Sequence, residues 1–329
     1  MRKMSGWQKA GLVAGIGCFS ILGVIVLGIV VAFVWARSTI SELGDTTPAR
    51  VERSIGLEPL QAEAPEASAG QVPRGTQESR QPMRLRVDLE EGTFTIRPGP
   101  AGGQVQVQGT YAPGLYELTD QRDTDTAGVA RHTIRFRSKA PIWARLLSGI
   151  GGGSDGRPEL TVLIPQGSPM DLSLRVAMGE SRIDLGGLTL RELDLTVSMG
   201  EHRINFAQPI IGEMSRVRLE TSMGDVSVDN LGNTRAQTIE TTGSMGSLTA
   251  DLGGGWQPGD DSSISFSQSM GELTLRVPSG VRLETSFRNA EGQTENRPSD
   301  RAAEPADANA PLLKLRVQTS MGESRVLRY

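Results

Sequence analysis

The chain has few of the residues that mark metal sites, disulfide frameworks and nucleic-acid-binding proteins. Its single cysteine, Cys18, cannot form a disulfide within the chain, and one cysteine alone does not supply the several thiolate ligands of a typical metal site. Only His132 and His202 could serve as a histidine base or ligand, and neither belongs to a Ser-His-acid pattern. A net charge of −4 with mixed signs argues against nucleic acid, which requires a basic stripe. We therefore expect no cofactor, no metal and no catalytic residue.

Aromatic residues are also scarce, at 4% of the chain, so the core must be mainly aliphatic. Glycine is abundant instead, with 40 residues among 329. Many glycines with many serines and threonines are typical of short strands joined by bends. This composition favours an all-β fold.

One short motif is repeated six times. It reads Ser or Ala, Met, Gly and then an acid, with Ser247 in place of the acid in one copy. Successive methionines lie 21, 24, 22, 25 and then 51 residues apart, and repeats of this period are typical of solenoids. The methionines are Met178, Met199, Met223, Met245, Met270 and Met321.

Apolar residues alternate on both sides of each motif, which predicts strands with one buried face. In the first copy Leu174 and Val176 lie four and two residues before the Met, and Ile183 lies five after it. The alternation changes parity at the Gly, so we expect a bend or bulge there that needs positive φ or close backbone approach. The predicted bend glycines are Gly179, Gly200, Gly224, Gly246, Gly271 and Gly322.

Two arrangements fit this pattern. Tight hairpins would carry Met-Gly at their tips, and would put Met in a turn position that prefers Gly, Asn or Asp. Stacked coils would place the methionines inside, where a flexible thioether fills gaps. We expect coils, with every motif methionine sheltered by the next coil, and His202 in an inward column of the core.

The N-terminal part reads as a membrane anchor. Residues 1–10 are basic, and no charge interrupts Gly11 to Trp35, which as a helix would span a hydrocarbon core of about 30 Å. The cationic flank should stay in the cytoplasm. We expect a transmembrane helix over residues 11–36, with a cleaved signal peptide as the alternative.

The rest of the chain divides into a linker and a folded domain. Residues 37–82 are rich in Pro, Ala, Glu and Ser and predict a disordered linker. Residues 83–329 form the predicted extracytoplasmic domain, which begins with a copy that lacks Met. Residues 288–310, rich in Pro, Ala and acids, predict an inserted loop.

The acids that follow the Met-Gly pairs should form a row on one outer edge. Two interpretations remain open: an edge that binds a ligand or cation, or a solvated rim partly neutralised by Arg182, Arg203 and Arg325. Ca²⁺ requires oxygen ligands that converge on a point, whereas a ladder spreads them. The row comprises Glu180, Glu201, Asp225, Glu272 and Glu323.

The phrases AMGESRIDLGGLTLRELDLTVSMGEHRINF (177–206) and RLETSMGDVSVDNL (218–231) resemble the bacterial putative-adhesin domain of unknown function, also called the toast-rack domain. They are also similar to the C-terminal domains of envelope-stress membrane proteins. The resemblance implies a right-handed, single-stack β-solenoid on a membrane-tethered protein that senses, scaffolds or adheres at the cell envelope. It brings no catalytic residues.

We therefore expect a non-catalytic binding, scaffold or envelope-sensing module, held at the cell membrane by residues 11–36. Its partners would be envelope proteins or glycans. The alternative is a β-helix enzyme that processes cell-envelope polysaccharide.

Overall fold

The computed structural model describes residues 31, 47–56, 83–101, 103–124, 129–139, 157–288, 294–295 and 309–329. The predicted anchor, residues 11–36, lies outside this part of the chain apart from Val31. None of the described residues belongs to a helix with the length and apolar character that a bilayer crossing requires.

The described chain confirms the all-β class, with a single 3-10 turn beside the strands. The elements are β1 (Ala49–Gly56), β2 (Met83–Pro98), β3 (Gln104–Tyr111), β4 (Tyr116–Thr124), β5 (Ala130–Ser138), β6 (Glu159–Ile164), β7 (Met170–Asp184), β8 (Leu190–Asn205), β9 (Arg216–Asp229), η1 (Leu231–Thr234), β10 (Thr238–Gly243), β11 (Ser247–Asp251), β12 (Ser262–Val277), β13 (Arg282–Arg288), β14 (Thr294–Glu295) and β15 (Leu312–Arg328).

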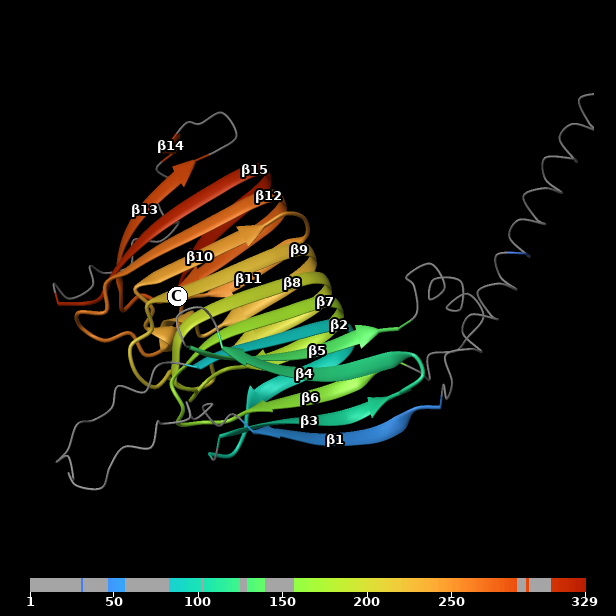
Figure 1. Ribbon diagram of the computed structural model, residues 1–329. Coiled ribbons are helices and arrows are strands. Elements are labelled where there is room, and N and C mark those ends of the chain that lie inside the picture. The colour runs from blue at the N-terminus through green and yellow to red at the C-terminus, as the bar shows by residue number, and fades with distance from the viewer. Residues whose placement is uncertain are drawn as a thin grey trace, which may run out of the picture.

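The sequence repeats stack on one another in parallel and in register (Figure 1). Leu172 of β7 pairs with Leu193 of β8, which pairs with Val217 of β9. The same order continues through β10 and β11, which share one coil, to β12 and β15. Parallel pairing excludes the hairpin arrangement, because consecutive strands of a hairpin are antiparallel.

Each long strand bends at its Met-Gly pair and contributes core residues from both arms. In β8, Leu195 and Val197 precede the bend and Ile204 follows it, and each is at most 2% exposed. The two arms therefore face each other across an aliphatic core. His202 lies in this core as expected, with no exposed surface.

The prediction that the motif methionines are sheltered is wrong. Met199, Met223, Met245 and Met270 are 40–44% exposed, and Met321 is 61% exposed. The inner side of each bend is closed by the stacked glycine backbones, since a Cβ on each motif glycine would meet the carbonyl oxygen of the glycine one coil earlier. No room remains there for a thioether, so the Met side chain points outward.

The N-terminal end of the stack contains antiparallel strands that the repeat pattern did not predict. β3 pairs antiparallel with β6, and β4 pairs antiparallel with β5. β1 pairs antiparallel with β3, so residues 49–56 of the predicted 37–82 linker are a strand. Val51 and Ile55, on the same face of β1, pack against the apolar core, and Ile55 is 3% exposed.

At the other end, the C-terminal strand lies between two earlier ones. β15 pairs parallel with β12 on one side and with β13 on the other. The last two copies of the motif are therefore adjacent in the stack although 51 residues separate their methionines, and Met321 pairs directly with Met270. Within the predicted insertion 288–310, Thr294–Glu295 form β14 on β13, and most of the remainder lies outside the described residues.

Candidate functional site

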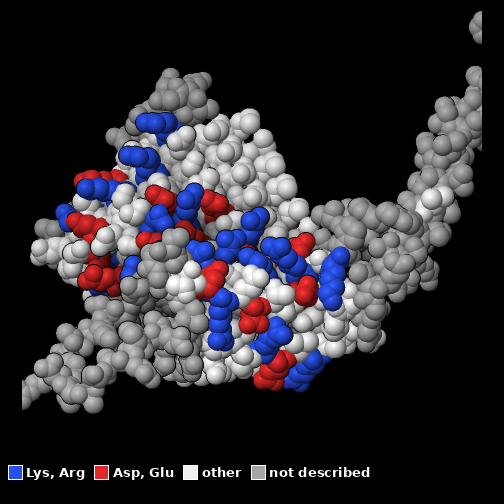
Figure 2. Space-filling model, viewed as in Figure 1, with Lys and Arg blue, Asp and Glu red and all other residues white. Residues whose placement is uncertain are grey.

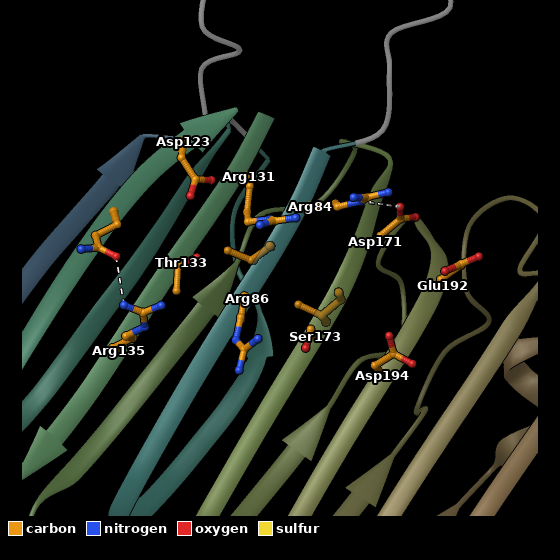
Figure 3. A pocket seen from close by; sticks show the side chains of 13 residues that line it. Arg84, Arg86, Asp123, Arg131, Thr133, Arg135, Asp171, Ser173, Glu192 and Asp194 are labelled. Atoms are coloured by element: carbon orange, nitrogen blue, oxygen red, sulfur yellow. Dashed lines mark hydrogen bonds and ion pairs between the residues drawn. The ribbon is translucent and has the colours of Figure 1, made fainter. Parts of the chain in front are cut away.

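An open groove with a volume of about 410 Å³ lies on the outer face of the first coils. Five strands line it: β4 and β5 on one side, β2 in the middle, and β7 and β8 on the other side (Figure 3). The lining is mostly charged. The labelled side chains are Arg84, Arg86, Asp123, Arg131, Thr133, Arg135, Asp171, Ser173, Glu192 and Asp194.

Strand alternation places these side chains. Arg84 and Arg86 flank Leu85 in β2, and Leu85 is 1% exposed because it belongs to the core. Asp171 and Ser173 flank the buried Leu172 in β7 in the same way. The buried residues fix the strand, so their neighbours must face outward.

The two signs of charge are separated across the groove. Arg84 of β2 lies opposite Arg131 of β5 on one side and opposite Asp171 of β7 on the other. Asp171 in turn lies opposite Glu192 of β8. Like charges on adjacent strands destabilise a sheet. The groove therefore carries arginines on β5 and β2 and carboxylates on β7 and β8, with one further carboxylate, Asp123 of β4, opposite Arg131.

Asp171 stands at the boundary between the two sides. Its Oδ2 lies 3.9 Å from Arg84 Nε and its Oδ1 lies 3.7 Å from Arg191 Nε. Both distances exceed that of a hydrogen bond, and Oδ1 is buried without a hydrogen-bond partner. Burial raises the pKa of the Asp171 carboxyl, an effect that the Arg191 guanidinium opposes. The Asp171 side chain is 18% exposed, so the carboxylate is only partly accessible from the groove.

The arginines differ in how firmly they are held. Arg86 Nε donates to both carboxylate oxygens of Asp88 at 3.0 Å. Arg135 Nη1 donates to Gln121 Oε1 at 3.0 Å. No carboxylate of the described chain forms an ion pair with Arg131. The Arg131 guanidinium is thus available to an anionic ligand, which it could bind through two parallel N–H donors.

Sequence reasoning missed this groove because its residues come from five strands that are distant in the chain. The available signal was weak: arginines at alternate outward positions in residues 84–86 and again in residues 131–135. Only the strand order β5, β2, β7, β8 brings them together with the acids.

The predicted acidic row lies elsewhere, directly after the bends. All five acids are exposed, and the strand register aligns Glu180 with Glu201, Glu201 with Asp225, and Glu272 with Glu323. Their exposure and alignment leave both interpretations of the row in place.

Arginines of the described chain form ion pairs with Glu201, Glu272 and Glu323 but not with Glu180 or Asp225. Arg203 forms an ion pair with Glu201, and Arg325 contacts Glu323 at 2.9 Å and Glu272 at 3.8 Å. Asp225, in contrast, accepts a hydrogen bond from Ser247 Oγ at 2.6 Å. In the described part of the chain, no three His, Cys, Asp or Glu side chains are grouped as a metal site would require.

Charged side chains are unevenly spread over the visible face of the stack. In Figure 2 they lie over the left and the middle of the stack as well as over the lower strands, which include those of the groove, whereas an area over β12 and β15 at the upper right carries none. The outward residues of the first half of β12 include Ser265 and Ser267, which are half-buried. The groove is therefore a local charged feature rather than part of a uniformly charged surface.

The motif serines form a second polar strip beside the methionines. They are exposed or half-buried and occupy the position before the Met in five of the six copies, whereas Ala177 precedes Met178. The strip comprises Ser198, Ser222, Ser244, Ser269 and Ser320.

No protein-family model matches the chain, and no curated protein does either. Solved structures do resemble it. A crystal structure described as a putative cell adhesion protein from Clostridium sporogenes aligns over 86% of this chain and 100% of its own, with 8% identity and a TM-score of 0.37. A putative adhesin from Bacteroides fragilis aligns over 84% of this chain and 99% of its own, with 10% identity and a TM-score of 0.30.

A putative adhesin from Parabacteroides distasonis aligns over 87% of this chain and 98% of its own, with 11% identity and a TM-score of 0.26. All three structures have TM-scores below 0.5. At such low identity the likeness concerns the fold alone.

Proposed function

We propose that this chain is a membrane-anchored, extracytoplasmic β-solenoid of right-handed, single-stack type that binds an acidic envelope polymer without catalysis. The observation that carries the proposal is the charged groove, in which no carboxylate of the described residues forms an ion pair with Arg131. The sequence of residues 11–36 supports the anchor and the orientation.

The geometry suggests how such a polymer would lie. Carboxylate or sulfate groups would bind Arg84 and Arg131, whose guanidinium groups form charge-assisted hydrogen bonds. Hydroxyl groups one strand further along would donate to Asp171 and Glu192. Neighbouring strands are about 4.8 Å apart, which is a spacing that groups on one sugar ring and the next can span. An acidic glycan therefore fits better than a neutral one.

The rigid stack supports this use. The groove is built on strands whose inward residues, such as Leu85 and Leu172, are almost fully buried. A binding face on packed strands loses little conformational entropy when it binds. The polar lining also matches a solvated polymer more closely than an apolar ligand.

A binding experiment tests the proposal. The purified full-length chain in lipid nanodiscs is titrated with acidic and neutral envelope glycans of equal length. We expect acidic glycans alone to bind, with affinity that falls as salt rises. Arg131→Glu should weaken binding by about tenfold or more, because a charge-assisted hydrogen bond contributes roughly 1.5–3 kcal/mol.

Arg97→Glu is the matched control, because Arg97 is also an exposed arginine of the sheet but does not line the groove. Equal loss in both variants would show a general charge effect and would contradict the groove. Shortening of the glycan during the titration would support instead the polysaccharide-processing enzyme.

The anchor and its orientation need a separate test. A cysteine replacing exposed Ser279, in a Cys18→Ser background, should react in intact cells with a reagent that cannot cross the membrane. Labelling only after cell lysis would contradict an extracytoplasmic domain.

A further inference from the structure

The six motif methionines form one continuous row along the bend of the stack. Met178 pairs with Met199, Met199 with Met223, and Met270 with Met321. Met245 completes the row: its backbone N–H donates to the carbonyl of Ser222 at 2.7 Å, and the carbonyl of the neighbouring Ser244 accepts from the N–H of Met270 at 2.9 Å. The backbone of each motif methionine therefore lies beside that of another motif methionine in the neighbouring coil.

Packing in the core does not explain why methionine occupies these positions. Five of its members are 40–61% exposed, whereas Met170 and Met214 in the core are 0% and 1% exposed. The positions on either side are hydrophilic, with serine before the Met in five copies and an acid two residues after it in five. An outward position in such surroundings would ordinarily hold a polar residue.

We propose that this row binds soft monovalent cations, Cu(I) in particular, through pairs or trios of neighbouring thioethers. Thioether sulfur is a soft ligand that favours Cu(I) over hard cations such as Ca²⁺ and Mg²⁺. The methionine side chain has three rotatable bonds, so neighbouring sulfurs can turn toward a common ion.

The strand spacing fits such coordination. Two sulfurs that bind one ion at about 2.3 Å, the length of a zinc–thiolate bond, are roughly 3.8–4.6 Å apart. Adjacent strands of a sheet are about 4.8 Å apart, so methionines in register need to move little to share an ion. Methionines two strands apart, at about 9.6 Å, are too distant without large rearrangement.

The charge near the row favours a cation, most of all where the acids form no ion pair with arginine, as at Asp225. The row runs beside the exposed acids, and Asp225 is hydrogen-bonded by Ser247 where Glu201 and Glu323 are paired with arginines. We therefore place the strongest binding at Met199, Met223 and Met245. A carboxylate nearby raises the local concentration of a cation and lowers the cost of bringing its charge to the surface.

Silver titration of the purified full-length chain tests the proposal, since Ag(I) is a soft monovalent probe that is not readily oxidised. The background carries Cys18→Ser, because a thiolate would compete. With methionine methyl groups labelled with ¹³C, we expect saturable shifts of the row methyl signals and none for Met170 or Met214, which are buried. About two or three ions should bind, more tightly than to free methionine by roughly tenfold or more.

Two triple variants separate a row from six independent thioethers. M199L/M245L/M321L leaves Met178, Met223 and Met270 without any neighbouring methionine. M199L/M223L/M245L leaves Met270 beside Met321. Leu is close to Met in volume, so both variants should fold with little loss of stability.

We expect the first variant to lose all tight binding and the second to keep about one ion. Equal residual binding in the two variants, or affinity no better than that of free methionine, would overturn the proposal. Displacement of Ag(I) by Cu(I), but not by Ca²⁺, should accompany the expected result. Displacement by Ca²⁺ would assign the ions to the acidic row instead and would also overturn it.

Discussion

A Cβ atom on Gly200 would overlap the carbonyl oxygen of Gly179, the equivalent glycine one coil earlier. Gly200 also has φ of +127°, a conformation that residues with side chains rarely adopt. The same two conditions recur at every motif glycine along the stack. The bend of each coil is thus set by backbone packed directly on backbone.

Replacement of Gly200 by alanine should destabilise the domain by about 3 kcal/mol, the sum of conformational strain and steric overlap. Chemical denaturation followed by circular dichroism measures the loss. Gly212→Ala is the matched control, because Gly212 has φ of +94° but nothing lies within 4 Å of its Cβ position. It should cost only about 1–2 kcal/mol. Equal costs would mean that close approach contributes nothing.

The exposed methionines should oxidise much faster than the buried ones. Brief treatment with hydrogen peroxide, followed by peptide mass spectrometry, should convert Met199 and Met223 to sulfoxide at nearly the rate of free methionine. Met170 should be protected because it has no exposed surface. In denaturant all three should react alike. Protection of Met199 and Met223 in the folded chain would restore the original expectation of sheltered methionines.

The stability of the domain should decrease in mild acid because of His202. Burial lowers the pKa of its imidazole, and Nδ1 lies 2.9 Å from Ser181 Oγ. Since the unfolded chain has a histidine pKa near 6.5, it binds the proton more readily than the folded chain. The contribution of neutral His202 to the stability of the folded state is therefore complete above about pH 6.5 and is progressively lost as the pH falls toward the lowered folded pKa.

Melting temperatures measured between pH 7.5 and pH 5 check this expectation. His202→Val, which copies Val226 at the equivalent position of the next coil, should flatten the decline. Part of the decline should remain, because burial also lowers the pKa of His132. An unchanged pH profile in the variant would show that His202 is not responsible.

The N-terminal coils should depend on one aromatic side chain. Phe136 is fully buried and lies 5.1 Å from Tyr111, 5.3 Å from Tyr116 and 6.2 Å from Phe94, measured between ring centroids. Phe136→Ala should cost about 3–5 kcal/mol through lost contacts and the cavity left behind. Phe136→Leu, which fills most of the volume, should cost clearly less. Similar losses in both would point to the aromatic contacts rather than to volume.

The repeat alone determined much of the architecture. Alternating apolar residues on both sides of Met-Gly, at a period of 21–25 residues in four intervals, require strands that stack in register, and residues such as Leu195 and Ile204 lie in the core where the pattern put them. This worked because strand alternation and coil spacing are local properties. The change of parity at the glycines likewise indicated the bends.

Only the tertiary structure decided which way the methionines face and how distant charges meet. Parity would carry Met199 inward, but contact between glycines of successive coils closes the inner side of the bend, and that contact is not visible within one copy. The strand at residues 49–56 likewise forms because β3 offers it an edge. Arg131 and Asp171 line the same groove because β2 pairs with β5 on one side and with β7 on the other. This strand order belongs to the first coil as a whole and cannot be read from any one repeat.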